Sequence, residues 1–142
     1  MVKVSIIGAG GYVFPLKLVR DILSFPKLQD STISLMDIDP ERLQKNARGV
    51  KELVDMCDLP TEVEVTTDRR QSLKNADFVI CTFQVGGLKA FKYDVEIPRE
   101  FGIDQTVGDT MGPGGIFRGL RTAEVLKGMA EDMEELCPEA LL

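Results

Sequence analysis

A predicted strand that ends in a glycine-rich turn opens this chain, and it restricts the fold more than any other feature. Residues 2–7 are mostly β-branched and apolar, which predicts a buried strand, and a Gly-Ala-Gly-Gly turn follows at residues 8–11. Apolar side chains then recur at helical spacing over residues 13–25, with Pro15 in the first turn and Pro26 as the stop. This order predicts the first unit of a nucleotide-binding α/β sheet.

Strands and helices are expected to alternate along the rest of the chain. We expect strands at residues 32–37, 63–67 and 76–82, helices at residues 40–57, 89–101 and 116–136, and a glycine-rich loop at residues 106–115. The last helix would turn one apolar face inward, formed by Leu120, Ala123, Leu126, Ala130, Met133 and Leu136. Such alternation implies right-handed crossovers. The predicted fold class is therefore α/β, a doubly wound, mainly parallel Rossmann-type sheet with flanking helices.

The length of 142 residues fits one ordinary domain. Residues 140–142, Ala-Leu-Leu, are typical of the opening of a further strand. We therefore expect one Rossmann-like domain over residues 1–142 that is truncated at its C-terminus.

The charge balance and the absence of histidine exclude several functions. Lys plus Arg total 17 and Asp plus Glu total 23, and the net charge of −6 argues against a nucleic-acid partner. No apolar run could span a bilayer, and no cationic leader precedes the first strand, so we expect a cytoplasmic protein with reduced cysteines. With no imidazole, chemistry must come from carboxylates, Lys, Tyr, Cys or a bound cofactor.

The first turn and the end of the second strand form the candidate cofactor site. Gly8 permits a tight turn, and Gly10 lets the main chain approach a pyrophosphate, which the amides of this turn and of the following helix would face. The third glycine of the usual pattern is replaced by Val13. Asp37 can accept hydrogen bonds from the adenosine ribose and would repel a 2′-phosphate, which favours NAD over NADP. Asp39 is better explained as a helix cap.

Two later segments could also bind a ligand. Thr82 and Gly86 follow the fourth strand, where open α/β sheets bind ligands, although a plain flexible loop is an equal alternative. Residues 107–121 combine five glycines and a proline with Asp109, Thr110, Arg118 and Arg121, and four of these glycines and the proline precede the expected helix. This segment could cradle an anion or sugar hydroxyls. A loop-to-helix junction that needs glycine for steric reasons explains it equally well.

These motifs together resemble those of glycoside hydrolase family 4. The resemblance rests on the turn at residues 8–10 and on three further segments, LMDIDPERL at 35–43, QVGG at 84–87 and GDTMGPGGIFRGLRT at 108–122. It covers essentially the whole chain and is closest to the branch with α-galactosidases and α-glucuronidase or galacturonidase-type enzymes. That family more often has Ser where this chain has Gly11.

The resemblance implies an enzyme that uses NAD and a divalent metal, usually manganese, to cleave α-glycosides. The implied reaction oxidises the sugar at C3, eliminates the C1 substituent after loss of the C2 proton, adds water and returns the hydride. The resemblance assigns cofactor binding to Gly8, Gly10, Gly11, Asp37, Thr82 and Gly86, and substrate contact to Asp109.

The same resemblance places the metal ligands and the tyrosine base in a later segment. Tyr12, Tyr93 and Cys137 do not match those positions, so we expect no catalytic residue and no metal ligand within this chain, which alone would be inactive on its small-molecule glycoside. The parent enzyme is expected to be a homo-oligomer. Two alternatives remain from the residues: the NAD-binding domain of a malate- or lactate-type dehydrogenase, and a stand-alone nucleotide-binding module.

Overall fold

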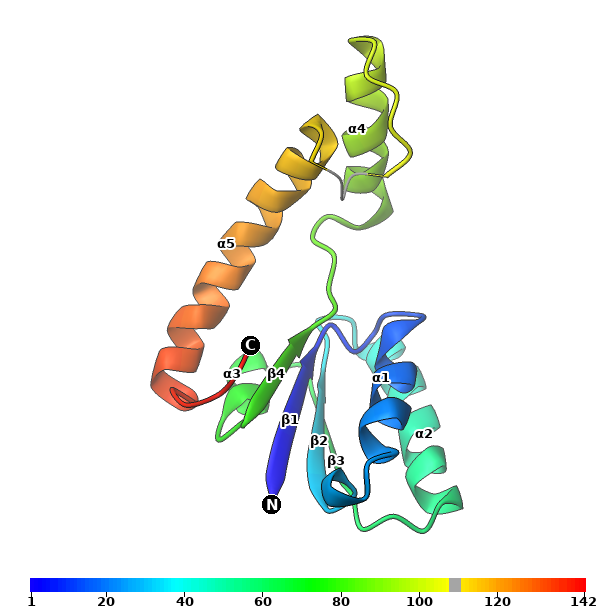
Figure 1. The fold of residues 1–142 in the computed structure, drawn as a ribbon, viewed down its shortest axis with the longest axis vertical. Coiled ribbons are helices and arrows are strands. Elements are labelled where there is room, and N and C mark those ends of the chain that lie inside the picture. Colours follow the sequence, from blue (N-terminus) through cyan, green and yellow to red (C-terminus); the bar gives the residue numbers. More distant parts are fainter. Residues whose placement is uncertain (108–110) are drawn as a thin grey trace. The chain divides into compact units, whose positions relative to one another are not determined.

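The computed structural model describes residues 1–107 and 111–142, and its centre is a four-stranded parallel sheet (Figure 1). The strand order is β3-β2-β1-β4, with β1 over Val2–Ile7, β2 over Ser31–Met36, β3 over Glu62–Thr66 and β4 over Phe78–Cys81. Leu141 forms an isolated parallel bridge with Phe78, and this confirms that the last residues begin to pair beside β4. The expected α/β fold with a parallel sheet is therefore confirmed.

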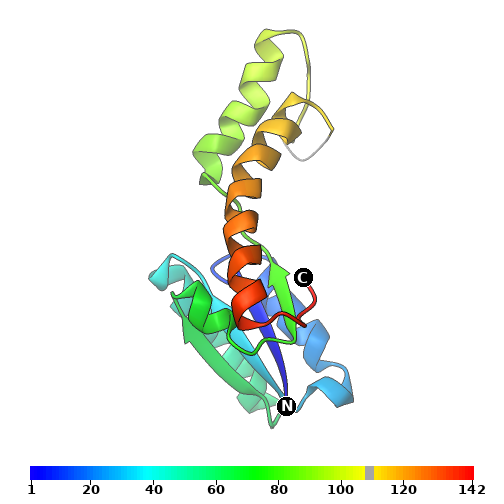
Figure 2. The ribbon, with the colours of Figure 1, turned by 90° about the vertical axis from the view of Figure 1, so that its left-hand side faces the viewer.

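Helices connect the strands, and within the first unit α1, α2 and α3 pack against the sheet (Figure 2). Their bounds are α1 Phe14–Leu23, η1 Pro26–Leu28, α2 Pro40–Met56, α3 Arg69–Leu73, α4 Gly87–Glu100 and α5 Pro113–Leu136. No helix among residues 1–107 and 111–142 combines the length and the apolarity needed to cross a membrane.

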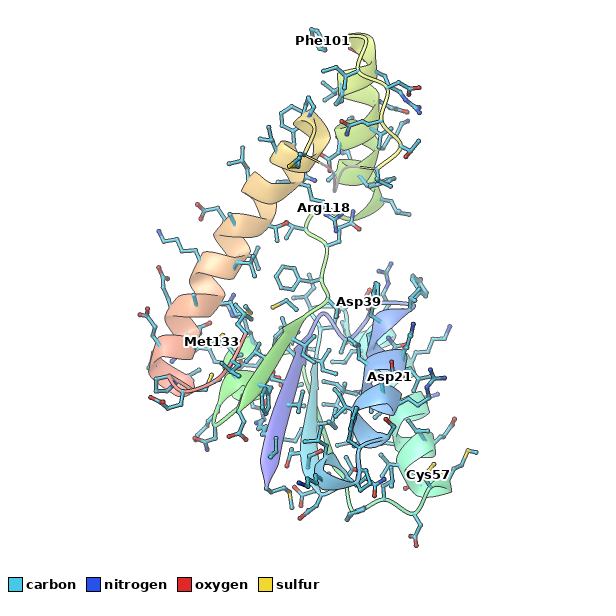
Figure 3. The ribbon with its side chains drawn as sticks, in the orientation of Figure 1. Asp21, Asp39, Cys57, Phe101, Arg118 and Met133 are labelled. Atoms are coloured by element: carbon cyan, nitrogen blue, oxygen red, sulfur yellow. The ribbon has the colours of Figure 1, made fainter. Side chains whose placement is uncertain are left out.

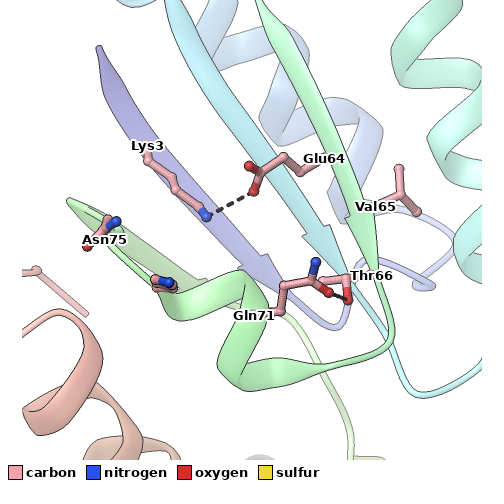
Figure 4. A pocket seen from close by; sticks show the side chains of 7 residues that line it. Lys3, Glu64, Val65, Thr66, Gln71 and Asn75 are labelled. Carbon is pink, nitrogen blue, oxygen red and sulfur yellow. Dashed lines mark hydrogen bonds and ion pairs between the residues drawn. The ribbon is translucent and has the colours of Figure 1, made fainter.

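One face of the sheet carries the main apolar cluster, and the other combines buried serines with apolar side chains such as Ile7 and Val79. Val4 and Ile6 of β1 join the α1 and α2 side chains in one buried cluster. Because side chains alternate along a strand, Ser5 points to the opposite face, where Ser72 of α3 shares hydrogen bonds with Ser5 and Ser34 at 2.7 and 2.9 Å. α3 is only five residues long and leaves part of this face open. There the Lys3 ammonium lies 2.9 Å from the Glu64 carboxylate (Figure 4).

The chain divides into two compact units, residues 1–83 with 131–142, and residues 84–130. The first unit contains the sheet, α1, α2 and α3. The second contains α4 and most of α5. That residues 1–142 act as one domain stays a prediction.

The last helix differs from the expectation in its start and in its buried face. It begins at Pro113 rather than residue 116, because proline suits the first helical position, so the expected loop at 106–115 is wrong at its end. Leu120 is 66% exposed, and the list of inward residues is also wrong at Ala123 and Ala130. Met129 and Asp132 are buried instead. Residues 113–130 and 131–136 of the helix belong to different units, so no single stripe is buried along its length.

Candidate functional site

The turn after β1 brings the main chain against the end of β4. Gly8 has φ +97°, and a Cβ atom there would lie 2.6 Å from the Phe83 main-chain nitrogen. The Thr82 hydroxyl donates to the Gly8 carbonyl oxygen at 3.0 Å, and the Thr82 N–H donates to the Ile7 carbonyl at 2.8 Å. Only glycine combines this backbone conformation with this close approach. Two of the sequence-predicted residues, Gly8 and Thr82, therefore lie in direct contact.

Asp37 lies against the same turn. Its Oδ2 atom accepts a hydrogen bond from the Gly10 N–H at 2.8 Å, and its Oδ1 atom accepts one from the Asp39 N–H at 2.9 Å. A Cβ atom on Gly10 would lie 2.7 Å from the Asp37 Cγ atom, so glycine at position 10 makes room for this carboxylate. The parallel pairing of β1 with β2 places the ends of the two strands side by side and brings the two residues together.

The amides of the turn itself are already used within the protein. The N–H groups of Gly8 and Ala9 both donate to the Met36 carbonyl, at 2.8 and 2.9 Å, and the Gly11 N–H donates to the Gly8 carbonyl at 3.1 Å. With Gly10 bound to Asp37, the expectation that residues 8–11 present bare amides is wrong. Within the part of the chain that the structure describes, the next two amides, of Tyr12 and Val13, donate to no acceptor.

Asn46 completes the turn and was not anticipated from the sequence. Its Nδ2 group donates to the carbonyl oxygens of Ala9 and Gly11, both at 2.7 Å. Asn46 directly precedes Ala47, which is one of the buried residues of α2. A polar residue next to the buried face of a helix was the one sign in the sequence that Asn46 contacts another part of the chain. Through these two hydrogen bonds Asn46, a residue of α2 more than thirty positions later in the sequence, holds the turn in place.

Asp39, Arg42 and Tyr12 are linked by successive contacts near the turn. Asp39 caps α2, as expected, by accepting hydrogen bonds from the amides of Glu41 and Arg42 (Figure 3). Its Oδ2 atom also lies 3.2 Å from the Arg42 Nε atom. The guanidinium carbon of Arg42 lies 5.5 Å from the centre of the Tyr12 ring, a cation–π contact on a ring that is 81% exposed.

The second unit holds the remaining predicted residues that the structure describes. Gly86 has φ +84° at the N-cap of α4, and a Cβ atom there would lie 2.5 Å from the Ala90 Cβ atom. Arg121 is bound by Asp94, whose two carboxylate oxygens accept from the two terminal guanidinium nitrogens at 2.8 and 2.5 Å. Asp109, the predicted substrate residue, and Thr110 lie outside the described residues.

The cysteines and acids offer no metal site in the described ranges. No group of three or more His, Cys, Asp or Glu side chains there could hold an ion. The three cysteines form no disulfide in this structure, and that they stay reduced remains a prediction. Burial raises the pKa of the Cys81 and Cys137 thiols, which opposes formation of the reactive thiolate.

A comparison with known protein families shows to which family this chain belongs. The family model described as family 4 glycosyl hydrolase matches residues 3–142. The chain belongs to this family. The resemblance that rested on the turn and the second glycine-rich segment is therefore confirmed.

Relatives of this family 4 chain are about three times its length. It is 43% identical to an α-galactosidase of Bacillus subtilis over 99% of this chain and 33% of the relative. A solved 6-phospho-α-glucosidase from gut microorganisms, in complex with NAD and Mn²⁺, is 25% identical with a TM-score of 0.85, over 99% of this chain and 32% of that one.

The dehydrogenase alternative shares the fold of this family 4 chain. A malate dehydrogenase of Plasmodium falciparum in complex with NADH has a TM-score of 0.61 at 17% identity, over 99% of this chain and 34% of that one. That likeness shows the Rossmann-type fold alone. The family match, which covers both units, separates this chain from the dehydrogenases.

Proposed function

We propose that this chain binds NAD through the turn after β1, as the dinucleotide-binding portion of a family 4 glycosidase. The observation that carries the proposal is the Asp37 carboxylate, held at the end of β2 by the Gly10 N–H. Ligands of open parallel sheets bind outside the carboxyl ends of the strands, and an acid in this position binds adenosine ribose hydroxyls. A solved relative in complex with NAD supports the choice of ligand.

The residues of the turn fit a dinucleotide in both their donors and their acceptors. A carboxylate offers about four acceptor sites, and two of those on Asp37 are used, so the ribose hydroxyls can donate to the others. The amides of Tyr12 and Val13 stand at the start of α1, where the helix dipole favours the pyrophosphate. In this proposal Gly8, Gly10, Gly11 and Thr82 shape the turn. The helix-start amides, rather than those of the turn, bind the anion.

For the whole protein we propose cleavage of α-glycosides by transient oxidation at the sugar C3. NAD, when bound, supplies the hydride acceptor for that oxidation. The Mn²⁺ of the solved relative supports a divalent metal as second cofactor, and its ligands are expected outside the described residues. Asp109 remains the proposed substrate contact and Gly86 a proposed neighbour of the cofactor. A cytoplasmic homo-oligomer also stays a prediction.

Calorimetric titration of the chain with NAD tests the proposal. We expect the unmodified chain to bind NAD. Gly10→Ala should weaken binding about tenfold or more, because the new methyl group displaces the Asp37 carboxylate. Gly49→Ala is the matched control, since a Cβ there makes only ordinary contacts with the Leu16 side chain. An unmodified chain that binds no NAD, or equal affinities for the two variants, would contradict the proposed function.

A further inference from the structure

We propose that Asp39 and Arg42 determine, together with Asp37, whether the site accepts a free 2′-hydroxyl or a 2′-phosphate on the adenosine ribose. The inference rests on the proposed function and deepens it. Arg42 is a cation beside a site that should repel phosphate, and Asp39 is the acid that holds it. Arg42 could therefore bind a phosphate, but the ion pair with Asp39 occupies it.

The geometry places Arg42 next to both segments that border Asp37. Its side chain lies over the Tyr12 ring, and Tyr12 follows the turn whose Gly10 amide holds Asp37. Its Nε atom lies 3.2 Å from Asp39, whose own amide holds the second oxygen of Asp37. Arg42 is thus connected to one of these segments by the ion pair with Asp39 and to the other by the ring contact with Tyr12. Ile38, between the two acids, is 87% exposed and does not cover the carboxylate.

The charges explain why this arginine does not favour NADP in the present chain. The ion pair with Asp39 offsets the charge of Arg42, while Asp37 adds one uncompensated negative charge at the proposed ribose position. A phosphate monoester carries about −1.5 to −2 charges at neutral pH. It therefore meets a net negative site. Among the described residues, Arg42 forms an ion pair with no carboxylate other than Asp39, so its guanidinium can bind phosphate once a neutral side chain replaces Asp39.

The substitution Asp39→Asn separates this role from the role of Asp39 in folding. Asparagine caps helices about as well as aspartate, so α2 should keep its first turn. The variant removes the charge that masks Arg42 and leaves Asp37 in place. Glu41→Gln is the matched control. It removes one negative charge from the same helix turn, and Glu41 forms no ion pair with Arg42 in the described structure.

The measurement is the ratio of the dissociation constants for NADP and NAD, determined by calorimetry for each purified variant. We expect Asp39→Asn to lower this ratio about tenfold and Asp37→Asn with Asp39→Asn to lower it further, because each step removes repulsion of the phosphate. Glu41→Gln should change the ratio less than about twofold, because an exposed charge without a direct contact is screened. Adding Arg42→Gln to Asp39→Asn should restore the original ratio.

Three results would overturn the inference. They are an unchanged ratio in Asp39→Asn, an equal change in Asp39→Asn and Glu41→Gln, and a lowered ratio that survives the removal of Arg42. Each of these leaves NAD binding by the unmodified chain intact, so the proposed function would stand. A chain that binds neither dinucleotide would remove the proposed function and this inference together.

Discussion

The two glycine-rich segments of this chain use glycine for different reasons. In the turn after β1, a Cβ on Gly10 would meet a carboxylate side chain, and the amides that follow the turn have no acceptor in the described structure. At the start of α5, a Cβ on Gly114 would collide with the Asp94 carbonyl oxygen and the Gln105 side-chain amide nitrogen. The first segment holds the Asp37 carboxylate and is followed by two amides without an acceptor, at the place where the proposed function puts a ligand. The second, at Gly114, is fitted to its own protein.

This difference resolves an alternative that the sequence left open. The segment at residues 107–121 was explained equally well as a ligand cradle or as a junction that needs glycine for steric reasons. At Gly114 the steric explanation holds, because the main chain of α5 touches the main chain of α4 there. Arg121 likewise binds the buried Asp94, so it is not an ordinary exposed helix charge. Family-specific residues can therefore be structural.

The largest expected effect comes from breaking the ion pair beneath the second segment. Asp94 is 1% exposed, so Asp94→Asn leaves the Arg121 charge without its partner. We expect the unfolding free energy of the second unit to fall by about 3 kcal/mol, measured by hydrogen exchange of α4 and α5 amides. Asp104→Asn is the control, because the Asp104 side chain is 86% exposed in its pair with Arg99, and it should cost under about 0.5 kcal/mol. Equal costs would contradict a buried pair.

The next effect tests the packing explanation for Gly114. Gly114→Ala places a methyl group inside the contact with the Asp94 carbonyl, and we expect a loss of about 2 kcal/mol by the same exchange measurement. Gly119→Ala in the same helix meets no atom within 4 Å and should be neutral or stabilising by about 0.5 kcal/mol. If both variants behave alike, Gly114 is not a packing residue and the comparison between the two segments fails.

The part of this arrangement that is local in sequence could be predicted, and the part that depends on distant contacts could not. The turn, Asp37 and the Asp39 cap follow from strand periodicity and helix-start signals within a few residues. Asn46 reaches the turn from α2, and Asp94 is buried only because Arg121, 27 residues later, folds onto it. The inward face of α5 was missed for the same reason, since periodicity does not reveal that a helix passes between two units.

A smaller effect is expected from Asn46, which supports the turn without facing the ligand. Asn46→Ala removes two hydrogen bonds, to the Ala9 and Gly11 carbonyls, from a partly buried position. We expect the unfolding free energy of the first unit to fall by about 1–2 kcal/mol and NAD affinity to fall about threefold, because the turn loses its inner support. Denaturant titration and calorimetry measure the two quantities. Unchanged NAD affinity in a destabilised variant would show that Asn46 supports the fold alone.

The smallest effect concerns an ion-pair cluster whose carboxylate is less buried than Asp94, since the Asp132 side chain is 12% exposed and that of Asp94 is 1% exposed. Burial by itself would raise the pKa of Asp132, but hydrogen bonds from Arg69 and Arg70 outweigh it, so the pKa is lowered in the folded chain. A carboxylate with a lowered pKa stabilises the fold at pH values above its unfolded pKa of about 3.9, and this stabilisation is lost as the pH falls below that value. The unfolding free energy of the first unit should therefore fall as the pH drops below about 4.

Asp132→Asn should remove that part of the pH dependence and cost about 1 kcal/mol at neutral pH, less than Asp94→Asn, because solvent screens Arg69 and Arg70. Denaturant titrations at a series of pH values measure both quantities. Glu134→Gln, an exposed acid on the same helix, is the control and should leave the acid slope in place. If Asp132→Asn keeps the slope of the unmodified chain, another carboxylate carries the acid sensitivity. In that case the ion pairs of Asp132 could no longer be compared with the buried pair of Asp94 and Arg121.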